Sequence, residues 1–94
     1  MAATAVHRVE IRYHNRQGAL LRILNAVSRR GLDLPYVLAE SAGDLHQATL
    51  LLEVTPIQMA QLGREWRSIV DVVEVRQPVP LQPEPEPEGF GSRV

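Results

Sequence analysis

The sequence contains neither cysteine nor lysine. Without cysteine the chain cannot form disulfides, thiolate zinc sites or iron–sulfur clusters, and it cannot use a thiol nucleophile. Without lysine all ten basic residues are arginine, and with eleven acidic residues the net charge is −1. Such a near-neutral chain has no overall electrostatic field that would attract nucleic acid.

Long apolar runs and aromatic residues are also scarce. No segment approaches the roughly 20 apolar residues of a membrane span, and residues 1–5 lack the apolar core of a signal peptide. Aromatic residues make up 4% of the chain, which leaves Tyr13 and Tyr36 as candidates for stacking against a nucleic-acid base. We therefore expect a cytoplasmic protein that has neither a membrane nor a nucleic acid as its partner.

The titratable side chains show no catalytic or metal-binding pattern. His7, His14 and His46 lack a ligand spacing such as His-x-x-x-His. The serines lie in no nucleophile-elbow sequence, and the carboxylates are too scattered to suggest acid–base catalysis. We expect no metal site, no cofactor and no catalytic residue.

Composition divides the chain into three parts. Residues 6–77 have the composition of one small folded domain, and a domain of this size often completes its core by oligomerising. Residues 1–5 are predicted to be a disordered N-terminus. In residues 78–94 proline alternates with glutamate, which predicts a disordered tail that is too poor in large apolar groups to pack a core.

Four segments have the pattern of β-strands. Residues 6–14 alternate between apolar and charged side chains, so that Val9, Ile11 and Tyr13 share the buried face. The other predicted strands are residues 34–40, 45–54 and 70–76. Proline at position 35 favours the sheet edge for the second strand, and three successive leucines favour a central position for the third. In the last strand, Val73 and Val75 are expected to face inward.

Two segments between these strands are predicted to be amphipathic helices. Four apolar residues recur at helical spacing in the first, namely Leu20, Leu21, Leu24 and Val27. The second begins with a capping box, in which Thr55 is the N-cap, Pro56 is N1 and Gln58 is N3. Its apolar face consists of Met59, Leu62, Trp66 and Ile69.

The order strand, helix, strand, strand, helix, strand predicts an α+β, ferredoxin-like βαββαβ fold. In this fold a four-stranded antiparallel sheet carries both helices on one face. Small phosphatases of the acylphosphatase type share it and grip phosphate with an arginine in a glycine-rich first loop. Arg16 before Gly18 is a faint match to that pattern, so a small enzyme of this type stays open as one reading.

The loop before the first helix is the best candidate for a binding site. Gly18 directly precedes the helix, and a turn glycine at this place can leave backbone N–H groups free to hold a small carboxylate. The alternative is an ordinary loop and helix cap.

Three segments carry a resemblance to a known family. Asn15–Ile23 fits the pattern Asn-x-x-Gly-x-Leu-x-Arg-Ile, and Arg29–Leu34 fits Arg-Arg-Gly-(aromatic or Leu)-Asn-Ile at the matching separation. Ser68–Val75 fits a closing Leu-Val-Asp-Val stretch. In these segments the sequence resembles the ACT domain, and within it the small regulatory subunit of acetolactate synthase (acetohydroxyacid synthase). The likeness covers about residues 6–77.

The resemblance implies a ligand site and a dimer. By analogy, the residues that line the amino-acid site are Asn15, Gly18, Ala19 and Asp33. Family members form side-by-side homodimers that join two sheets into one. The expected interface consists of the first helix and the edge-strand residues Leu34, Tyr36, Val37 and Leu38, because an exposed strand edge is a ready template for pairing.

The implied function is that of a non-catalytic regulatory subunit in branched-chain amino-acid biosynthesis. Its partner would be the thiamine-diphosphate-dependent catalytic large subunit of acetolactate synthase, which it would bind and activate. The likeness is to the short, valine-insensitive isozyme type, since residues 78–94 stand where longer members carry a second domain. Asp33 stands where valine-sensitive members have asparagine, and a carboxylate there would repel the carboxylate of the ligand. A branched-chain amino acid is therefore expected to be a weak effector at most. The alternative is a free-standing amino-acid-sensing ACT domain that regulates another metabolic enzyme.

Overall fold

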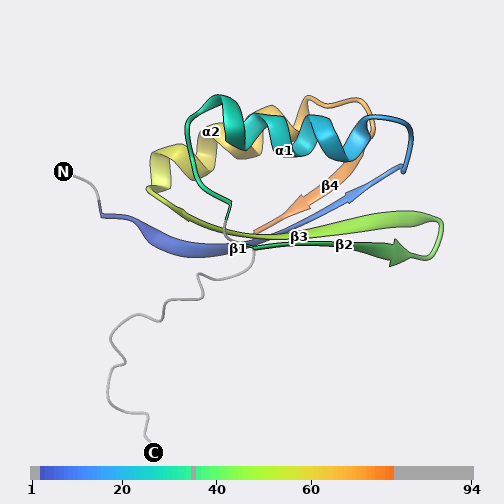
Figure 1. The fold of residues 1–94 in the computed structure, drawn as a ribbon, viewed down its shortest axis with the longest axis horizontal. Coiled ribbons are helices and arrows are strands. Elements are labelled where there is room, and N and C mark those ends of the chain that lie inside the picture. The colour runs from blue at the N-terminus through green and yellow to red at the C-terminus, as the bar shows by residue number, and fades with distance from the viewer. Residues whose placement is uncertain (1–2, 35, 78–94) are drawn as a thin grey trace, which may run out of the picture.

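The computed structural model describes residues 3–34 and 36–77. Its elements, in chain order, are β1 Ala5–Tyr13, α1 Ala19–Arg29, β2 Tyr36–Ala42, β3 Leu45–Val54, α2 Pro56–Arg67 and β4 Val72–Arg76. The strands form one antiparallel sheet in the order β2-β3-β1-β4, and both helices cover the same face of it (Figure 1). The predicted ferredoxin-like βαββαβ fold is confirmed.

Some boundaries differ from the prediction. β1 begins at Ala5, which pairs with Val54. The N-terminal segment predicted to be disordered, residues 1–5, is therefore one residue too long. β2 begins at Tyr36 instead of Leu34. The predicted tail, residues 78–94, lies outside the described residues.

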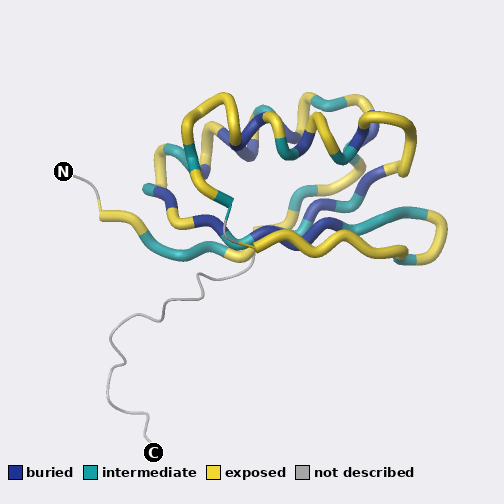
Figure 2. Tube along the Cα trace, viewed as in Figure 1, coloured by how far each residue is buried: buried dark blue, intermediate teal, exposed yellow. Residues whose placement is uncertain are grey.

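The core lies between the two helices and the sheet face that they cover (Figure 2). The alternation in β1 and β3 places one set of side chains there, and Val9, Ile11 and Leu50 are fully buried. α2 adds Trp66, whose indole is also fully buried. The opposite face of β1 meets solvent, and its charged residues form ion pairs, such as Arg8 Nη2 to Glu10 Oε2 at 3.1 Å.

The two helices begin in different ways. At α2 the Thr55 hydroxyl accepts the Gln58 N–H at 3.2 Å, while the Gln58 side chain accepts the Thr55 N–H at 2.9 Å. The predicted capping box is therefore confirmed, with Pro56 in the first turn. α1 begins instead at Gly18, which has a φ of 81° and supplies no side-chain cap. Its start must be held by other contacts.

The predicted apolar face of α1 is displaced around the helix. Leu21 is 61% exposed, whereas Ala19, Ile23, Ala26 and Val27 are buried. Leu21 lies two residues from Ile23, about 200° around the helix, and therefore on the opposite side from the core, whereas the predicted Val27 is buried. Leu20 and Leu24 pack at the margin of the core.

The prediction that Val73 faces inward is wrong. Tyr13 pairs with Val72 and Arg12 pairs with Glu74, so the register shifts at this point and Val73 is the extra residue of a bulge. The shift exposes 54% of Val73 and leaves Val72 and Val75 packed against the core. A simple two-residue alternation cannot reveal a bulge.

The position of β2 at the edge of the sheet is confirmed. Its residues are exposed along almost the whole strand, including Tyr36 at 44%, Val37 at 38% and Leu38 at 41%. An apolar edge strand with its backbone groups free on one side is suited to pairing with another strand.

Candidate functional site

The loop that leads into α1 is tightly turned. The Arg16 N–H donates to the His14 carbonyl at 2.7 Å, and the Ala19 N–H donates to the Arg16 carbonyl at 3.0 Å. The Arg22 N–H donates to the Gly18 carbonyl at 3.0 Å. Gly18 makes the turn possible because its positive φ is disfavoured for residues with a Cβ atom.

The predicted ligand residues of this loop are not equally accessible. Asn15 and Gly18 are exposed. Ala19 is 1% exposed, and its N–H is already bound to a carbonyl within the loop. Ala19 can therefore pack beneath a surface site, but its backbone N–H is not a free donor for an anion.

Asp71 connects this loop to the remainder of the domain through ion pairs of its carboxylate and a hydrogen bond to its carbonyl. Its carboxylate accepts Arg16 Nη1 at 2.8 Å through Oδ1 and Arg22 Nη1 at 3.2 Å through Oδ2. The Asp71 carbonyl accepts the His14 N–H at 2.8 Å. The role of Asp71 is not predictable from local sequence patterns, because its partners are 49 and 55 positions away in the chain. The only signal was that Arg22 and Asp71 both belong to the segments that resemble the ACT family.

Arg16 is also the residue whose position before Gly18 resembles that of the phosphate-binding arginine in small phosphatases. In the structure its guanidinium is engaged with the buried carboxylate of Asp71. This geometry gives Arg16 a structural task and disfavours the phosphatase reading.

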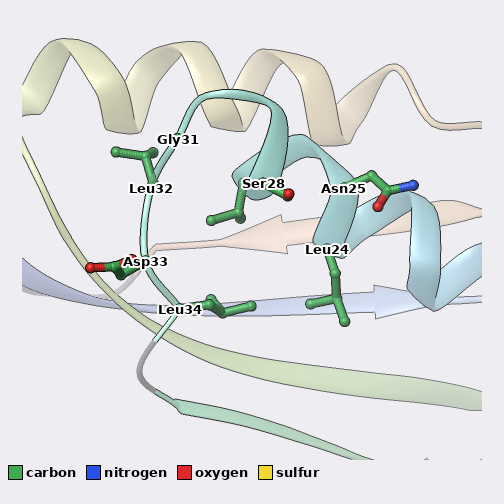
Figure 3. Close-up of a pocket in the computed structure, with 8 residues that line it drawn as sticks. Leu24, Asn25, Ser28, Gly31, Leu32, Asp33 and Leu34 are labelled. Atoms are coloured by element: carbon green, nitrogen blue, oxygen red, sulfur yellow. The ribbon is translucent and has the colours of Figure 1, made fainter.

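A second candidate region is an open cleft of about 420 Å³ between α1 and the start of β2. It is lined by Leu24, Asn25, Val27, Ser28, Gly31, Leu32, Asp33 and Leu34. Figure 3 shows the side chains of Leu24 and Leu34 on the inner side of this cleft, whereas the Asp33 carboxylate points away from Leu34. Polar and apolar groups contribute about equally to the lining, so the cleft offers contacts both to an apolar side chain and to polar groups of a small ligand.

The surroundings of Asp33 are acidic. Asp33 also borders a depression of about 330 Å³ together with Gly31, Leu32 and Glu53. Two carboxylates at one depression disfavour the approach of an anionic group. That Asp33 weakens the binding of a ligand carboxylate stays a prediction.

The structure does not bring all predicted ligand residues together within one chain. Asn15 and Gly18 lie before the first residue of α1, and Asp33 lies beyond its last residue. At 1.5 Å per residue, the 11-residue helix separates them by about 16 Å. A small ligand that touches both ends requires a second copy of the chain.

The described residues also bear on metal binding and on membrane insertion. Among residues 3–34 and 36–77, no group of three His, Asp or Glu side chains is placed to hold a metal ion. No helix in this part of the chain is long and apolar enough to cross a membrane.

The fold has clear counterparts among solved structures. The ACT domain of a GTP pyrophosphokinase from Chlorobium tepidum is 13% identical, with a TM-score of 0.70 over 79% of this chain and 97% of that chain. An uncharacterized protein of Thermotoga maritima is 16% identical, with a TM-score of 0.69 over 84% of this chain and 99% of that one. The C-terminal domain of the MgtC protein from Mycobacterium tuberculosis is 17% identical, with a TM-score of 0.69 over 85% and 90% of the two chains.

These similarities show the fold, which is the one that ACT domains adopt. No protein-family model and no curated protein matches the sequence. The likeness to the small subunit of acetolactate synthase therefore depends on the three sequence segments alone.

Proposed function

We propose that this chain is a non-catalytic, amino-acid-sensing regulatory domain of the ACT type. The observation that carries the proposal is the coincidence of an ACT fold with the Asn15–Gly18 turn before α1 and a partly apolar cleft after it. Both features belong to segments that resemble the family. The cleft offers apolar walls to a side chain, and the turn is the place at which a small carboxylate is expected.

The ligand site requires a homodimer. In a two-fold dimer the same surface of each copy forms the interface. Pairing through β2, with the axis perpendicular to the sheet, sets the two α1 helices antiparallel. The Asn15–Gly18 loop of one copy then lies beside Asp33 of the other, and the distance along α1 is no longer an obstacle.

The surface that such a dimer would bury includes the apolar side chains of Leu34, Tyr36, Val37 and Leu38, of which the last three are exposed. The neighbouring side of α1 adds the polar residues Asn25 and Ser28. Burial of apolar area is the main driving force for association of this kind. This region stays a predicted interface until the oligomeric state is measured.

The finer proposal is that the chain regulates acetolactate synthase. It would bind the thiamine-diphosphate-dependent catalytic subunit and raise its activity. A subunit without catalytic residues can do so only by binding the active state of its partner more tightly than the inactive state. The support for this partner is the sequence resemblance of Asn15–Ile23, Arg29–Leu34 and Ser68–Val75.

The test is acetolactate formation by the purified catalytic subunit from the same organism, measured while this chain is added. We expect activity to rise and to saturate as the chain is added, and the chain alone to have no turnover. An unchanged rate at micromolar concentrations of folded chain contradicts the finer proposal.

A second candidate is an ACT domain that senses an amino acid for another metabolic enzyme. The similarity to the ACT domain of a GTP pyrophosphokinase favours it, because ACT domains occur with enzymes of different kinds. Co-purification from the native cell separates the two candidates. A thiamine-diphosphate-dependent subunit supports the first, and a different enzyme in stoichiometric amount supports the second.

A further inference from the structure

Asp71 differs from the other acidic residues of the domain in its burial. It is 4% exposed and is the only acidic residue in the buried class among residues 3–34 and 36–77. Withdrawing a carboxylate from water costs several kcal/mol unless charged or hydrogen-bonding partners compensate. Arg16 and Arg22 supply that compensation, one on each carboxylate oxygen.

Its two side-chain partners come from the predicted ligand turn itself and from the helix that follows it. Arg16 lies inside the turn, and Arg22 lies in α1. The Arg22 guanidinium lies close to the turn, since its Nη2 atom is 3.6 Å from the position that a Cβ atom on Gly18 would occupy. Through its carbonyl, Asp71 also receives the N–H of His14 at the end of the preceding segment. Asp71 thus contacts the chain at three places, namely His14 before the turn, Arg16 within it and Arg22 after it.

Other means of fixing the start of α1 are weak. Gly18 provides no side-chain cap, and the first turn of the helix contains no acidic residue. α2, by contrast, has a complete capping box. The start of α1 therefore depends on contacts that reach it from outside the helix, and those to Asp71 are the charged ones.

We propose that Asp71 is the positioning residue of the ligand loop. Its ion pairs hold residues 14–18 in the conformation in which Asn15 and Gly18 can meet a ligand. The consequence for amino-acid binding rests on the proposed function, whereas the ordering of the loop does not. The proposal also gives a physical reason for Arg22 and Asp71 to stand in segments that are far apart in the sequence.

The far end of α1 offers a matched control. Glu65 of α2 forms ion pairs there with Arg29 and with Arg30. The side chains of Arg16 and Arg29 are exposed to a similar degree, 66% and 62%. Substituting either one removes a largely exposed arginine from an ion pair at one end of α1, but only Arg16 belongs to the predicted ligand loop.

The first experiment measures amide hydrogen exchange in Arg16→Gln, Arg16→Lys and Arg29→Gln. We expect Arg16→Gln to accelerate exchange of the His14 and Ala19 amides about fivefold, because local opening no longer has to break a charge-assisted contact. Arg16→Lys keeps the charge and should restore most of the protection. Arg29→Gln should leave these two amides unchanged, and amides of the central strand β3 should be unchanged in all three variants.

Equal exchange in wild type and Arg16→Gln overturns the proposal. Equal acceleration in Arg16→Gln and Arg29→Gln also overturns it, because a general loss of stability would then explain the effect. A double-mutant cycle with Asp71→Asn adds a direct test. Arg16→Gln should have no further effect on exchange once the Asp71 carboxylate is gone, and an undiminished effect contradicts the pairing.

The second experiment measures the dissociation constant of L-valine by chemical-shift titration of Asp33→Asn, with and without Arg16→Gln. We expect Arg16→Gln to weaken binding about threefold or more, since a disordered loop must be ordered on binding. Unchanged affinity shows that the loop needs no positioning. If Asp33→Asn binds neither L-valine, L-leucine nor L-isoleucine, the proposed function fails, and the exchange measurements still decide whether Asp71 orders the loop.

Discussion

The indole N–H of Trp66 donates a hydrogen bond of 3.0 Å to the backbone carbonyl of Ile23. Both residues are fully buried, so this bond joins α2 to α1 inside the core. It also satisfies the one polar atom of a side chain that otherwise packs among apolar groups. The relative position of the two helices, and therefore of the loop and cleft at the two ends of α1, depends on this contact.

Replacing Trp66 with phenylalanine should destabilise the domain. The variant leaves a cavity and removes the buried hydrogen bond to the Ile23 carbonyl, and we expect a loss of about 2–4 kcal/mol in the free energy of unfolding. Urea denaturation followed by far-ultraviolet circular dichroism measures this. Ile57→Ala is the control, because Ile57 lies on the same helix but is 66% exposed, and its substitution should cost less than about 1 kcal/mol.

Gly18→Ala should destabilise the domain by about 1–2 kcal/mol, the cost of placing a Cβ atom in the left-handed region. The cost arises in the backbone, because the added Cβ would meet Arg22 atoms only at ordinary contact distances. Gly18→Asn should cost less, since asparagine tolerates a positive φ better than alanine. Thermal unfolding of the three proteins checks the order, and an alanine variant as stable as wild type would show that the turn is not constrained.

Burial raises the pKa of the Tyr13 phenol above its usual value of 10.0. The folded state then retains the proton at pH values at which the unfolded chain has lost it. This contribution to stability is fully present below about pH 10 and is lost as the pH rises through the pKa of the folded state. Denaturation between pH 8 and 11 should show the loss in wild type and a smaller loss in Tyr13→Phe. Tyr36→Phe, which removes a hydroxyl from a half-exposed ring, is the control.

Val37→Asp should convert the predicted dimer into monomers, because it places a charge within the apolar edge strand β2. Val70→Asp is the matched control, since Val70 is 86% exposed but lies just before β4, on the other side of the sheet. Sedimentation equilibrium at high micromolar concentration distinguishes the species. A wild-type chain that is monomeric under these conditions contradicts the predicted interface.

Local patterns in the sequence were sufficient to predict the fold. Alternation identified β1, and the spacing of Thr55 and Gln58 identified the start of α2, because both signals come from neighbouring residues. Features that depend on tertiary contact were not predictable in this way. The bulge at Val73 arises from the register between β1 and β4, and the exposure of Leu21 arises from which side of α1 faces the sheet.

The candidate site was predictable in part for the same reason. Gly18 was recognised because a glycine before a helix has a local meaning, and the structure gives it a positive φ. The task of Asp71 could not be recognised, because nothing in the sequence pairs an aspartate with arginines about 50 positions away. The separation of Gly18 from Asp33 along α1 also became evident only in three dimensions.

The central claim is that the chain senses a small amino acid at a site shared between two copies. The most direct measurement is an amide chemical-shift titration of wild type and Asp33→Asn with L-valine, L-leucine and L-isoleucine at millimolar concentration. We expect Asp33→Asn to bind at least one of them more tightly than wild type, because the substitution removes the charge that repels the ligand carboxylate. Shifts should appear both at Gly18 and at residues 31–34, the two ends of α1. The absence of any shift in both proteins, with their folds intact, contradicts the account.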